Sequence, residues 1–158
     1  MSDAELVIRR AKERGLLIVL AESCTAGLVS SLLAEVPGAS AALWGSLVTY
    51  TPEAKSLLLG IDAGLLEKYG VVSRETALAM ARGALEKSGA HVALSVTGLA
   101  GPDGDGSALP VGTVWIGTAS RGGRAAGREY RFTGDRNRIR EDAAREALRV
   151  LHSVLNRL

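Results

Sequence analysis

A continuous apolar run at residues 16–21, Leu-Leu-Ile-Val-Leu-Ala, constrains the fold more than any other feature of the sequence. The run lies between two segments with helical periodicity. The first of these, at residues 3–14, begins with a capping box formed by Ser2 and Glu5 and ends at Gly15. A strand without polar alternation is buried on both faces, which is typical of parallel sheets covered by helices. The run therefore predicts an α/β fold.

The remaining pattern extends this prediction to the whole chain. Apolar segments at residues 43–50 and 91–97 indicate two further strands, and residues 111–119 and 125–132 indicate an antiparallel hairpin. Helical spacing and capping signals predict helices at 25–36, 52–59, 63–69 and 74–88, and a long closing helix from residue 135. We expect residues 1–158 to form a single three-layer α/β/α domain with a mixed, mostly parallel central sheet.

Composition narrows the class of protein. A single cysteine, Cys24, excludes an internal disulfide and a cysteine-based metal site. The apolar run is far shorter than the ~20 residues needed to cross a bilayer, and the N-terminus is no secretory signal, so we expect a cytoplasmic protein without membrane contact. Fifteen arginines and four lysines favour an anionic ligand. No DNA-reading motif accompanies them, so nucleic acid is not an expected partner.

Polar residues gather where three predicted strands end. In open α/β sheets ligands bind beyond the carboxyl ends of the strands, which here means residues 22–27, 50–55 and 97–106. Ser23, Cys24 and Thr25 precede a predicted helix, whose free N–H groups either bind an anion or are capped by these side chains. The glycine-dense segment 98–106 brings backbone N–H groups close to a ligand, unless it is only a long turn.

Lysine is the remaining candidate for a general base. His91 begins a strand at the far end of the sheet and His152 lies in the closing helix, so a serine or Cys24 nucleophile lacks a histidine. Lys55 falls in the first turn after Thr51-Pro52, where the helix dipole opposes an ammonium and burial would lower its pKa further. The alternative is a solvated Lys55 paired with an acidic neighbour.

Five segments, in this order and spacing, resemble the CinA C-terminal domain family over nearly the whole chain. They are Ala21-Glu22-Ser23-Cys24-Thr25, Val48-Thr49-Tyr50 leading to Glu53-Ala54-Lys55, Val96-Thr97-Gly98-Leu99-Ala100-Gly101-Pro102, Pro110-Val111-Gly112-Thr113-Val114 and Gly134-Asp135-Arg136. Two positions depart from the family pattern. Ala26 stands where many relatives have a second glycine, and Leu109 stands where lysine is frequent.

The resemblance implies nicotinamide-nucleotide amidohydrolase activity. Such an enzyme hydrolyses the carboxamide of nicotinamide mononucleotide to nicotinic acid mononucleotide and ammonia, with no metal or organic cofactor. It also implies a Ser-Lys mechanism, with Ser40 aligned as the nucleophile, Lys55 as the base and Ser23 assisting. Domains of this family tend to pair, so a homodimer is expected.

The other site residues are also expectations from the resemblance. Tyr50 and Thr97 join the catalytic group. The residues expected to bind substrate are Glu22, Thr25, Gly98, Gly101, Arg136 and Arg140. Two alternatives stay open: a non-catalytic nucleotide-binding or interaction module linked to competence or DNA damage, and hydrolysis of another small amide.

Overall fold

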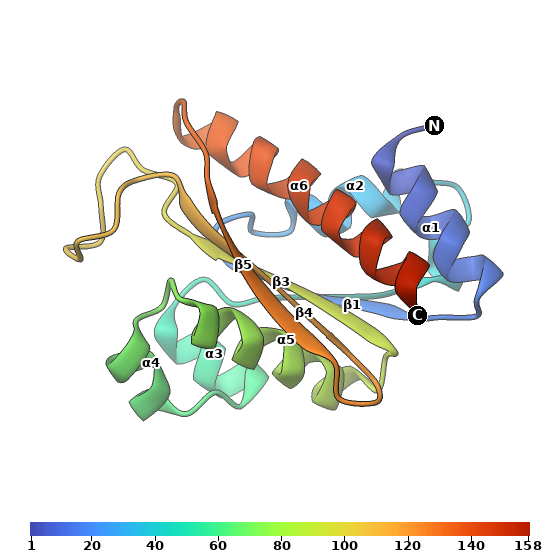
Figure 1. Ribbon diagram of the computed structural model, residues 1–158, viewed down its shortest axis with the longest axis horizontal. Coiled ribbons are helices and arrows are strands. Elements are labelled where there is room, and N and C mark those ends of the chain that lie inside the picture. The colour runs from blue at the N-terminus through green and yellow to red at the C-terminus, as the bar shows by residue number, and fades with distance from the viewer.

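A five-stranded sheet with helices on both faces forms the protein, as the computed structural model covering residues 1–158 shows (Figure 1). Twelve elements follow one another along the chain: α1 (Asp3–Glu13), β1 (Ile18–Glu22), α2 (Leu28–Ala34), the 3-10 helix η1 (Ala39–Ala41), β2 (Leu43–Val48), α3 (Pro52–Leu59), α4 (Ala63–Tyr69), α5 (Arg74–Ser88), β3 (Val92–Gly98), β4 (Thr113–Ser120), β5 (Ala125–Arg131) and α6 (Arg136–Arg157).

The sheet has the strand order β2-β1-β3-β4-β5. β1 pairs in parallel with both β2 and β3, whereas β4 pairs antiparallel with β3 and with β5. Four strands therefore run in one direction and only β4 opposes them, which confirms the predicted mixed, mostly parallel sheet. The chain passes from β1 outward to β2 and then returns to β3 on the other side of β1. This reversal opens a crevice at the carboxyl ends of β1 and β3.

Two helical layers bury the two faces of the sheet. Ile18 and Leu20 of β1 pack toward α1, α2 and α6, and Val19 and Ala21 pack toward α3, α4 and α5. Figure 1 shows α1, α2 and α6 on one side of the sheet and α3, α4 and α5 on the opposite side. Every residue of β1 is buried, as the unbroken apolar run predicted.

Side-chain caps fix most helix boundaries where the sequence predicted them. Ser2 and Glu5 form the capping box of α1, and Thr51, Asp62 and Ser73 each accept a backbone N–H at the start of α3, α4 and α5. No helix has both the length and the apolar character to span a bilayer.

The predicted start of the second helix at residue 25 is wrong. α2 begins at Leu28 because residues 23–27 form an irregular turn, in which Ala26 has φ 47° and Gly27 has φ 97°. These left-handed conformations do not belong to a right-handed helix. The turn delivers Ser23 to the end of the sheet before α2 starts.

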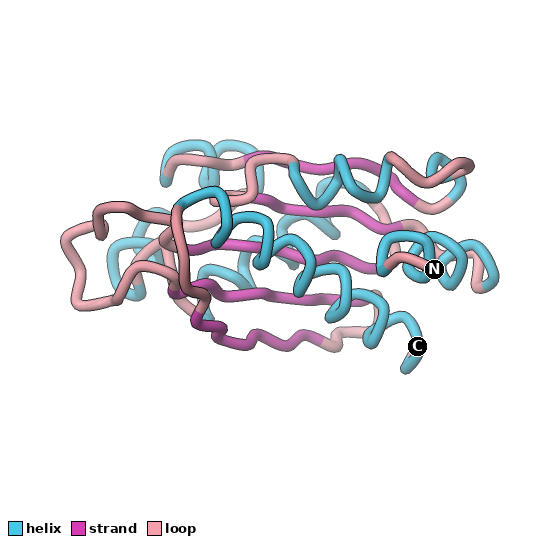
Figure 2. The backbone as a smooth tube through the Cα atoms, turned by 90° about the horizontal axis from the view of Figure 1, so that it is seen from above, coloured by secondary structure: helices cyan, strands magenta, loops and turns pink.

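The segment between β3 and β4 forms a long loop at one end of the molecule. It projects beyond the carboxyl ends of β1 and β3, as Figure 2 shows from above. Its base is anchored by backbone hydrogen bonds from Leu99 N–H to Thr113 O and from Gly112 N–H to Leu99 O. The loop therefore overhangs the crevice at the switch point of the sheet.

Candidate active site

A cavity of about 190 Å³ lies at the carboxyl ends of β1, β2 and β3. The segments after these three strands line it, together with the N-terminus of α6 and the connection between α4 and α5. Predicted site residues among its lining are Ser23, Tyr50, Lys55, Thr97, Gly98, Gly101 and Arg136. The structure thus brings these seven residues together from parts of the sequence more than 110 positions apart.

A lysine and a serine meet in this cavity. The Lys55 Nζ donates hydrogen bonds to Ser23 Oγ at 3.0 Å and to the Thr49 carbonyl oxygen at 2.8 Å. Lys55 is only 2% exposed, and Ser23 is buried beside it. The alternative of a solvated lysine paired with an acidic neighbour is therefore wrong, because no salt bridge is formed and water has almost no access.

Burial changes the proton affinity of this lysine. Desolvation lowers the pKa of Lys55 from 10.5 to about 8, against the opposing influence of the neighbouring Cys24. A pKa near 8 leaves a usable neutral fraction close to physiological pH, as a general base requires. The Ser23 hydroxyl lies within hydrogen-bonding distance of that amine, which is the arrangement of an activated nucleophile.

Within one chain, the structure does not bring Ser40 to Lys55. Ser40 is exposed and lies in η1, immediately before β2, whereas Lys55 follows the opposite end of that strand. The six residues of β2 span about 20 Å at the usual rise per residue. Ser23, expected to assist, is the serine that contacts the lysine.

Glu22 holds the turn and does not reach the cavity. Its side chain is fully buried and accepts hydrogen bonds from Val29 N–H at 2.8 Å, Ser30 N–H at 3.2 Å and Ser46 Oγ at 2.9 Å. It therefore caps the N-terminus of α2 from the preceding strand. The structure does not support the expected role of Glu22 in substrate binding, because its side chain is fully buried and does not line the cavity.

Thr25 also lies outside the cavity. Its side chain is completely buried, its hydroxyl has no hydrogen-bond partner, and it is absent from the cavity lining. The structure therefore does not support the expected contact between Thr25 and substrate. The side chains of Ser23, Cys24 and Thr25 do not cap the N–H groups at the start of α2, because Glu22 accepts hydrogen bonds from them instead.

Arg136 provides a positive charge at the edge of the cavity. Its guanidinium donates to the Gly101 carbonyl oxygen and to the Tyr50 hydroxyl, both at 2.6 Å. Arg136 is the first residue of α6, so it stands beside the free N–H groups of a long helix. Helix N-termini and arginine forks are favourable places for a phosphate.

Arg140 is directed elsewhere. Its Nε donates to the Cys24 carbonyl oxygen at 2.9 Å and its Nη2 donates to the Thr25 carbonyl oxygen at 3.1 Å. It does not line the cavity. The structure therefore does not support the expected direct role of Arg140 in substrate binding, and Arg136 is the arginine that lines the cavity.

Thr97 and Gly98 close the inner wall at the end of β3. Thr97 is 1% exposed, and its hydroxyl donates to the Val71 carbonyl oxygen at 2.7 Å. Gly98 is required by the sheet rather than by a ligand, since a Cβ there would lie 2.8 Å from the Thr113 carbonyl oxygen. The wall therefore leaves little tolerance for larger residues.

Sequence reasoning missed the segment that joins α4 to α5. Val71 and Val72 line the cavity, and Val71 accepts the hydrogen bond from Thr97. Asp103 and Asp105 of the long loop line it as well. Val71 and Val72 follow Gly70 without any motif, so the sequence contains no signal that this segment of the chain reaches the cavity.

Cys24 lies next to Ser23, and its thiol is neutral. Burial raises the pKa of its thiol to about 11, so the thiolate is scarcely populated at neutral pH. His91 has a structural role, because its Nδ1 accepts a hydrogen bond from Leu17 N–H at 2.9 Å. No group of three His, Cys, Asp or Glu side chains is placed to hold a metal ion.

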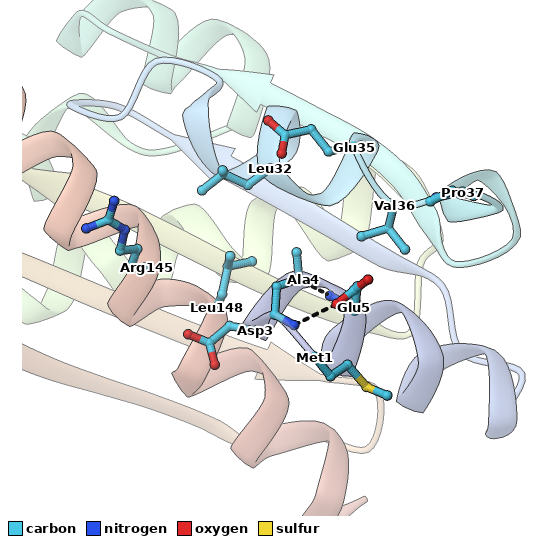
Figure 3. Close-up of a pocket in the computed structure, with 11 residues that line it drawn as sticks. Met1, Asp3, Ala4, Glu5, Leu32, Glu35, Val36, Pro37, Arg145 and Leu148 are labelled. Atoms are coloured by element: carbon cyan, nitrogen blue, oxygen red, sulfur yellow. Dashed lines mark hydrogen bonds between the residues drawn. The ribbon is translucent and has the colours of Figure 1, made fainter.

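A larger cavity of about 590 Å³ lies away from this site, among α1, α2 and α6. Figure 3 shows residues such as Met1, Glu35 and Arg145 around it. Ser2 lines it but is engaged with Glu5 in the capping box. With no base beside a free nucleophile, this cavity has no arrangement for catalysis.

The family model of the CinA C-terminal domain matches residues 2–155. The chain belongs to this family. It is 44% identical over 133 residues to the nicotinamide-nucleotide amidohydrolase PncC of Enterobacter agglomerans, a match that covers 84% of this chain and 81% of that protein. It is 48% identical over 142 residues to a CinA-like protein of Geobacter metallireducens, covering 90% of this chain but 34% of the longer relative. The chain thus spans about a third of such relatives.

Solved structures agree with this membership. A CinA superfamily protein from Klebsiella pneumoniae superposes with a TM-score of 0.95 at 32% identity, over 99% of this chain and 97% of that one. The competence/damage inducible protein CihA from Agrobacterium tumefaciens superposes with a TM-score of 0.89 at 42% identity, with the same coverage. The fold predicted from sequence is therefore that of the family.

Proposed function

We propose that this protein is a Ser-Lys amidohydrolase that converts nicotinamide mononucleotide to nicotinic acid mononucleotide and ammonia. The observation that carries the proposal is the buried Lys55 Nζ, 3.0 Å from Ser23 Oγ at the switch point of the sheet. The relationship to PncC supports a hydrolase and suggests the substrate. Ser23 replaces Ser40 as the nucleophile in this proposal.

The first half of the reaction transfers the acyl group to the enzyme. Neutral Lys55 accepts the proton of the Ser23 hydroxyl while Oγ attacks the carboxamide carbon. The tetrahedral intermediate then collapses, the carbon–nitrogen bond breaks, and the ammonium of Lys55 returns the proton to the departing ammonia. In the second half water attacks the resulting ester as Lys55 accepts its proton. The bond between the acyl carbon and Ser23 Oγ then breaks, the Lys55 ammonium returns the proton to Oγ, and nicotinic acid mononucleotide is released.

Backbone N–H groups are available to stabilise the oxyanion. The N–H of Cys24, the residue after the proposed nucleophile, donates to no backbone carbonyl. An N–H at this position is a frequent oxyanion donor in serine hydrolases, where loss of one donor costs about 3 to 4 kcal/mol of barrier. The Gly98 N–H is a second candidate, because Leu99 N–H pairs with Thr113 O and leaves Gly98 opposite Val114 in a non-hydrogen-bonded pair of β3 and β4.

Arg136, at the edge of the cavity, suits the phosphate of a nucleotide, whereas Asp103 and Asp105 line the cavity on the side of the long loop. A volume of about 190 Å³ is below the ~300–1,000 Å³ typical of pockets for drug-sized ligands, so only the ring amide would enter fully. The ribose phosphate would then extend outward to Arg136 and the N-terminus of α6. There the guanidinium offers a bidentate contact to phosphate.

The direct test is incubation of the pure protein with nicotinamide mononucleotide, with ammonia and nicotinic acid mononucleotide measured together. We expect the two products in equal amounts. Nicotinamide riboside, which lacks the phosphate, should be turned over with a KM raised roughly 10- to 100-fold, the value of a charged hydrogen-bonded pair. Free nicotinamide should be a poorer substrate still.

Two outcomes would reject the proposal in different ways. Binding of the nucleotide without turnover at micromolar enzyme would favour the nucleotide-binding module. Faster hydrolysis of another small amide than of nicotinamide mononucleotide would keep the Ser-Lys chemistry and reject the substrate.

A further inference from the structure

The carbonyl groups that follow the proposed nucleophile are held by one side chain from the distant end of the chain. Arg140 of α6 donates from Nε to the Cys24 oxygen at 2.9 Å and from Nη2 to the Thr25 oxygen at 3.1 Å. A guanidinium has two such N–H vectors in a rigid fork, so it fixes two successive peptide planes at once. The third arm, Nη1, donates to Asn137 of the same helix at 3.3 Å.

Three backbone hydrogen bonds also hold this turn, one of them from Leu28 N–H to the same Thr25 oxygen at 3.0 Å. Ser23 N–H donates to Val96 O at 2.9 Å, and Ala26 N–H donates back to Ser23 O at 3.0 Å. Ala26 has a left-handed φ of 47°, which is unfavourable for a residue with a Cβ. A turn in such a conformation persists only when its surroundings over-determine it.

The orientation of these peptide planes bears on the reaction. In a planar trans peptide the C=O and the next N–H point in opposite directions. Holding the Cys24 oxygen against α6 therefore also sets the direction of the Thr25 N–H, and it restrains the residue that carries the free Cys24 N–H. A loosened turn would shift both Ser23 Oγ and the oxyanion donor away from the carboxamide.

We infer that Arg140 is a positioning residue that holds the Ser23 turn in its reactive geometry and takes no part in binding the substrate. Arg136 and Arg140 lie one helical turn apart, with Arg136 on the cavity and Arg140 on the back of the nucleophile turn. The first two turns of α6 thus place Arg136 at the cavity and Arg140 against the turn that carries Ser23. The turnover readout of this inference rests on the proposed function.

The experiment compares Arg140→Gln, Arg140→Lys and Arg136→Gln with the unchanged protein. For Arg140→Gln we expect kcat to fall about 100-fold with KM within about threefold, because small misplacement of reacting groups costs this much in rate. Arg140→Lys keeps the charge but loses the fork, so it should recover less than a tenth of the lost kcat. Arg136→Gln should chiefly raise KM. Arg145→Gln, at an exposed position of the same helix, is the control and should change neither constant.

Chemical rescue distinguishes positioning of the Ser23 turn by Arg140 from a role in the stability of the fold alone. The variant Arg140→Ala leaves room for a guanidinium ion, and added ethylguanidinium should raise its kcat at least tenfold while leaving Arg145→Gln unaffected. Circular dichroism and melting temperatures of all variants establish that they are folded. Should Arg140→Ala fail to fold, the comparison of Arg140→Gln with Arg140→Lys carries the test.

A second readout does not depend on the nucleotide. A serine-directed fluorophosphonate forms an Oγ–phosphorus bond at Ser23 as fluoride leaves and Lys55 takes the proton, and mass spectrometry follows the labelling. Arg140→Gln should slow labelling at least tenfold, with Ser23→Ala as the unlabelled control. Arg140-dependent labelling without hydrolysis of nicotinamide mononucleotide would reject the proposed substrate and retain this inference. The inference about Arg140 would be overturned if Arg140→Gln left both kcat and the labelling rate unchanged, or if it raised KM alone. Absence of labelling in the unchanged protein would overturn it as well.

Discussion

The pH dependence of the reaction follows from the burial of Lys55. Desolvation lowers its pKa from 10.5 to about 8, and only the neutral amine accepts the Ser23 proton. A shift of this size corresponds to about 3 kcal/mol between the two protonation states. With a pKa of 8, the neutral fraction is about one tenth at pH 7 and about nine tenths at pH 9.

We therefore expect kcat/KM for nicotinamide mononucleotide to rise about tenfold from pH 7 to pH 9 and then to level off. The assay is initial ammonia release at subsaturating substrate in buffers of constant ionic strength. Lys55→Arg keeps the cation but has no neutral form in this range, so it should be nearly inactive at every pH. A rate that still climbs tenfold per pH unit beyond pH 9 would show an unperturbed lysine. A flat profile from pH 6 to 9 would remove lysine as the base.

Two further predictions concern the turn that carries Ser23. Glu22→Gln replaces an acceptor of three hydrogen bonds by an amide that opposes one donor with another, so the free energy of unfolding should fall by about 2 kcal/mol. Urea denaturation measures this, and Glu35→Gln, at the exposed C-terminal end of the same helix, is the control and should have little effect. Ala26→Gly relieves a left-handed φ and should raise the free energy of unfolding by about 1 kcal/mol. A lower urea midpoint for Ala26→Gly would show that the turn is unstrained.

Helix boundaries were predictable because their signals are local. The hydroxyl of Thr51 and the carboxylate of Asp62 cap helices within three residues of their own positions, so the order of residues alone reveals them. The start of α2 was not predictable in the same way. Its N–H groups are capped by Glu22 from the end of β1, seven residues earlier, while Ser23, Cys24 and Thr25 only looked like caps.

The candidate site was partly predictable because the carboxyl ends of parallel strands meet at one edge of a sheet. That rule placed Ser23, Lys55 and Thr97 together. The choice of Ser40 came from alignment to the family alone, and within one chain η1 lies at the other end of β2 from Lys55. The role of Arg140 depends on a contact across 116 positions of sequence, which no local pattern contains.

The burial of Lys55 was beyond sequence reasoning as well. Its place in the first turn of α3 suggested a destabilised ammonium but not the direction of its side chain. Packing of α3 against α4 and α5 closes Lys55 off from solvent and directs its Nζ to Thr49 and Ser23. Tertiary packing, not helix position, therefore provides most of the pKa shift.

The central claim is that Ser23 and Lys55 are the reacting pair. Ammonia release from nicotinamide mononucleotide by Ser23→Ala and Ser40→Ala, measured side by side with the unchanged protein, tests it most directly. We expect Ser23→Ala to lose at least about 1,000-fold in kcat, as removal of a catalytic nucleophile does, and Ser40→Ala to keep full activity. Full activity in Ser23→Ala, or a comparable loss in Ser40→Ala, would contradict the account.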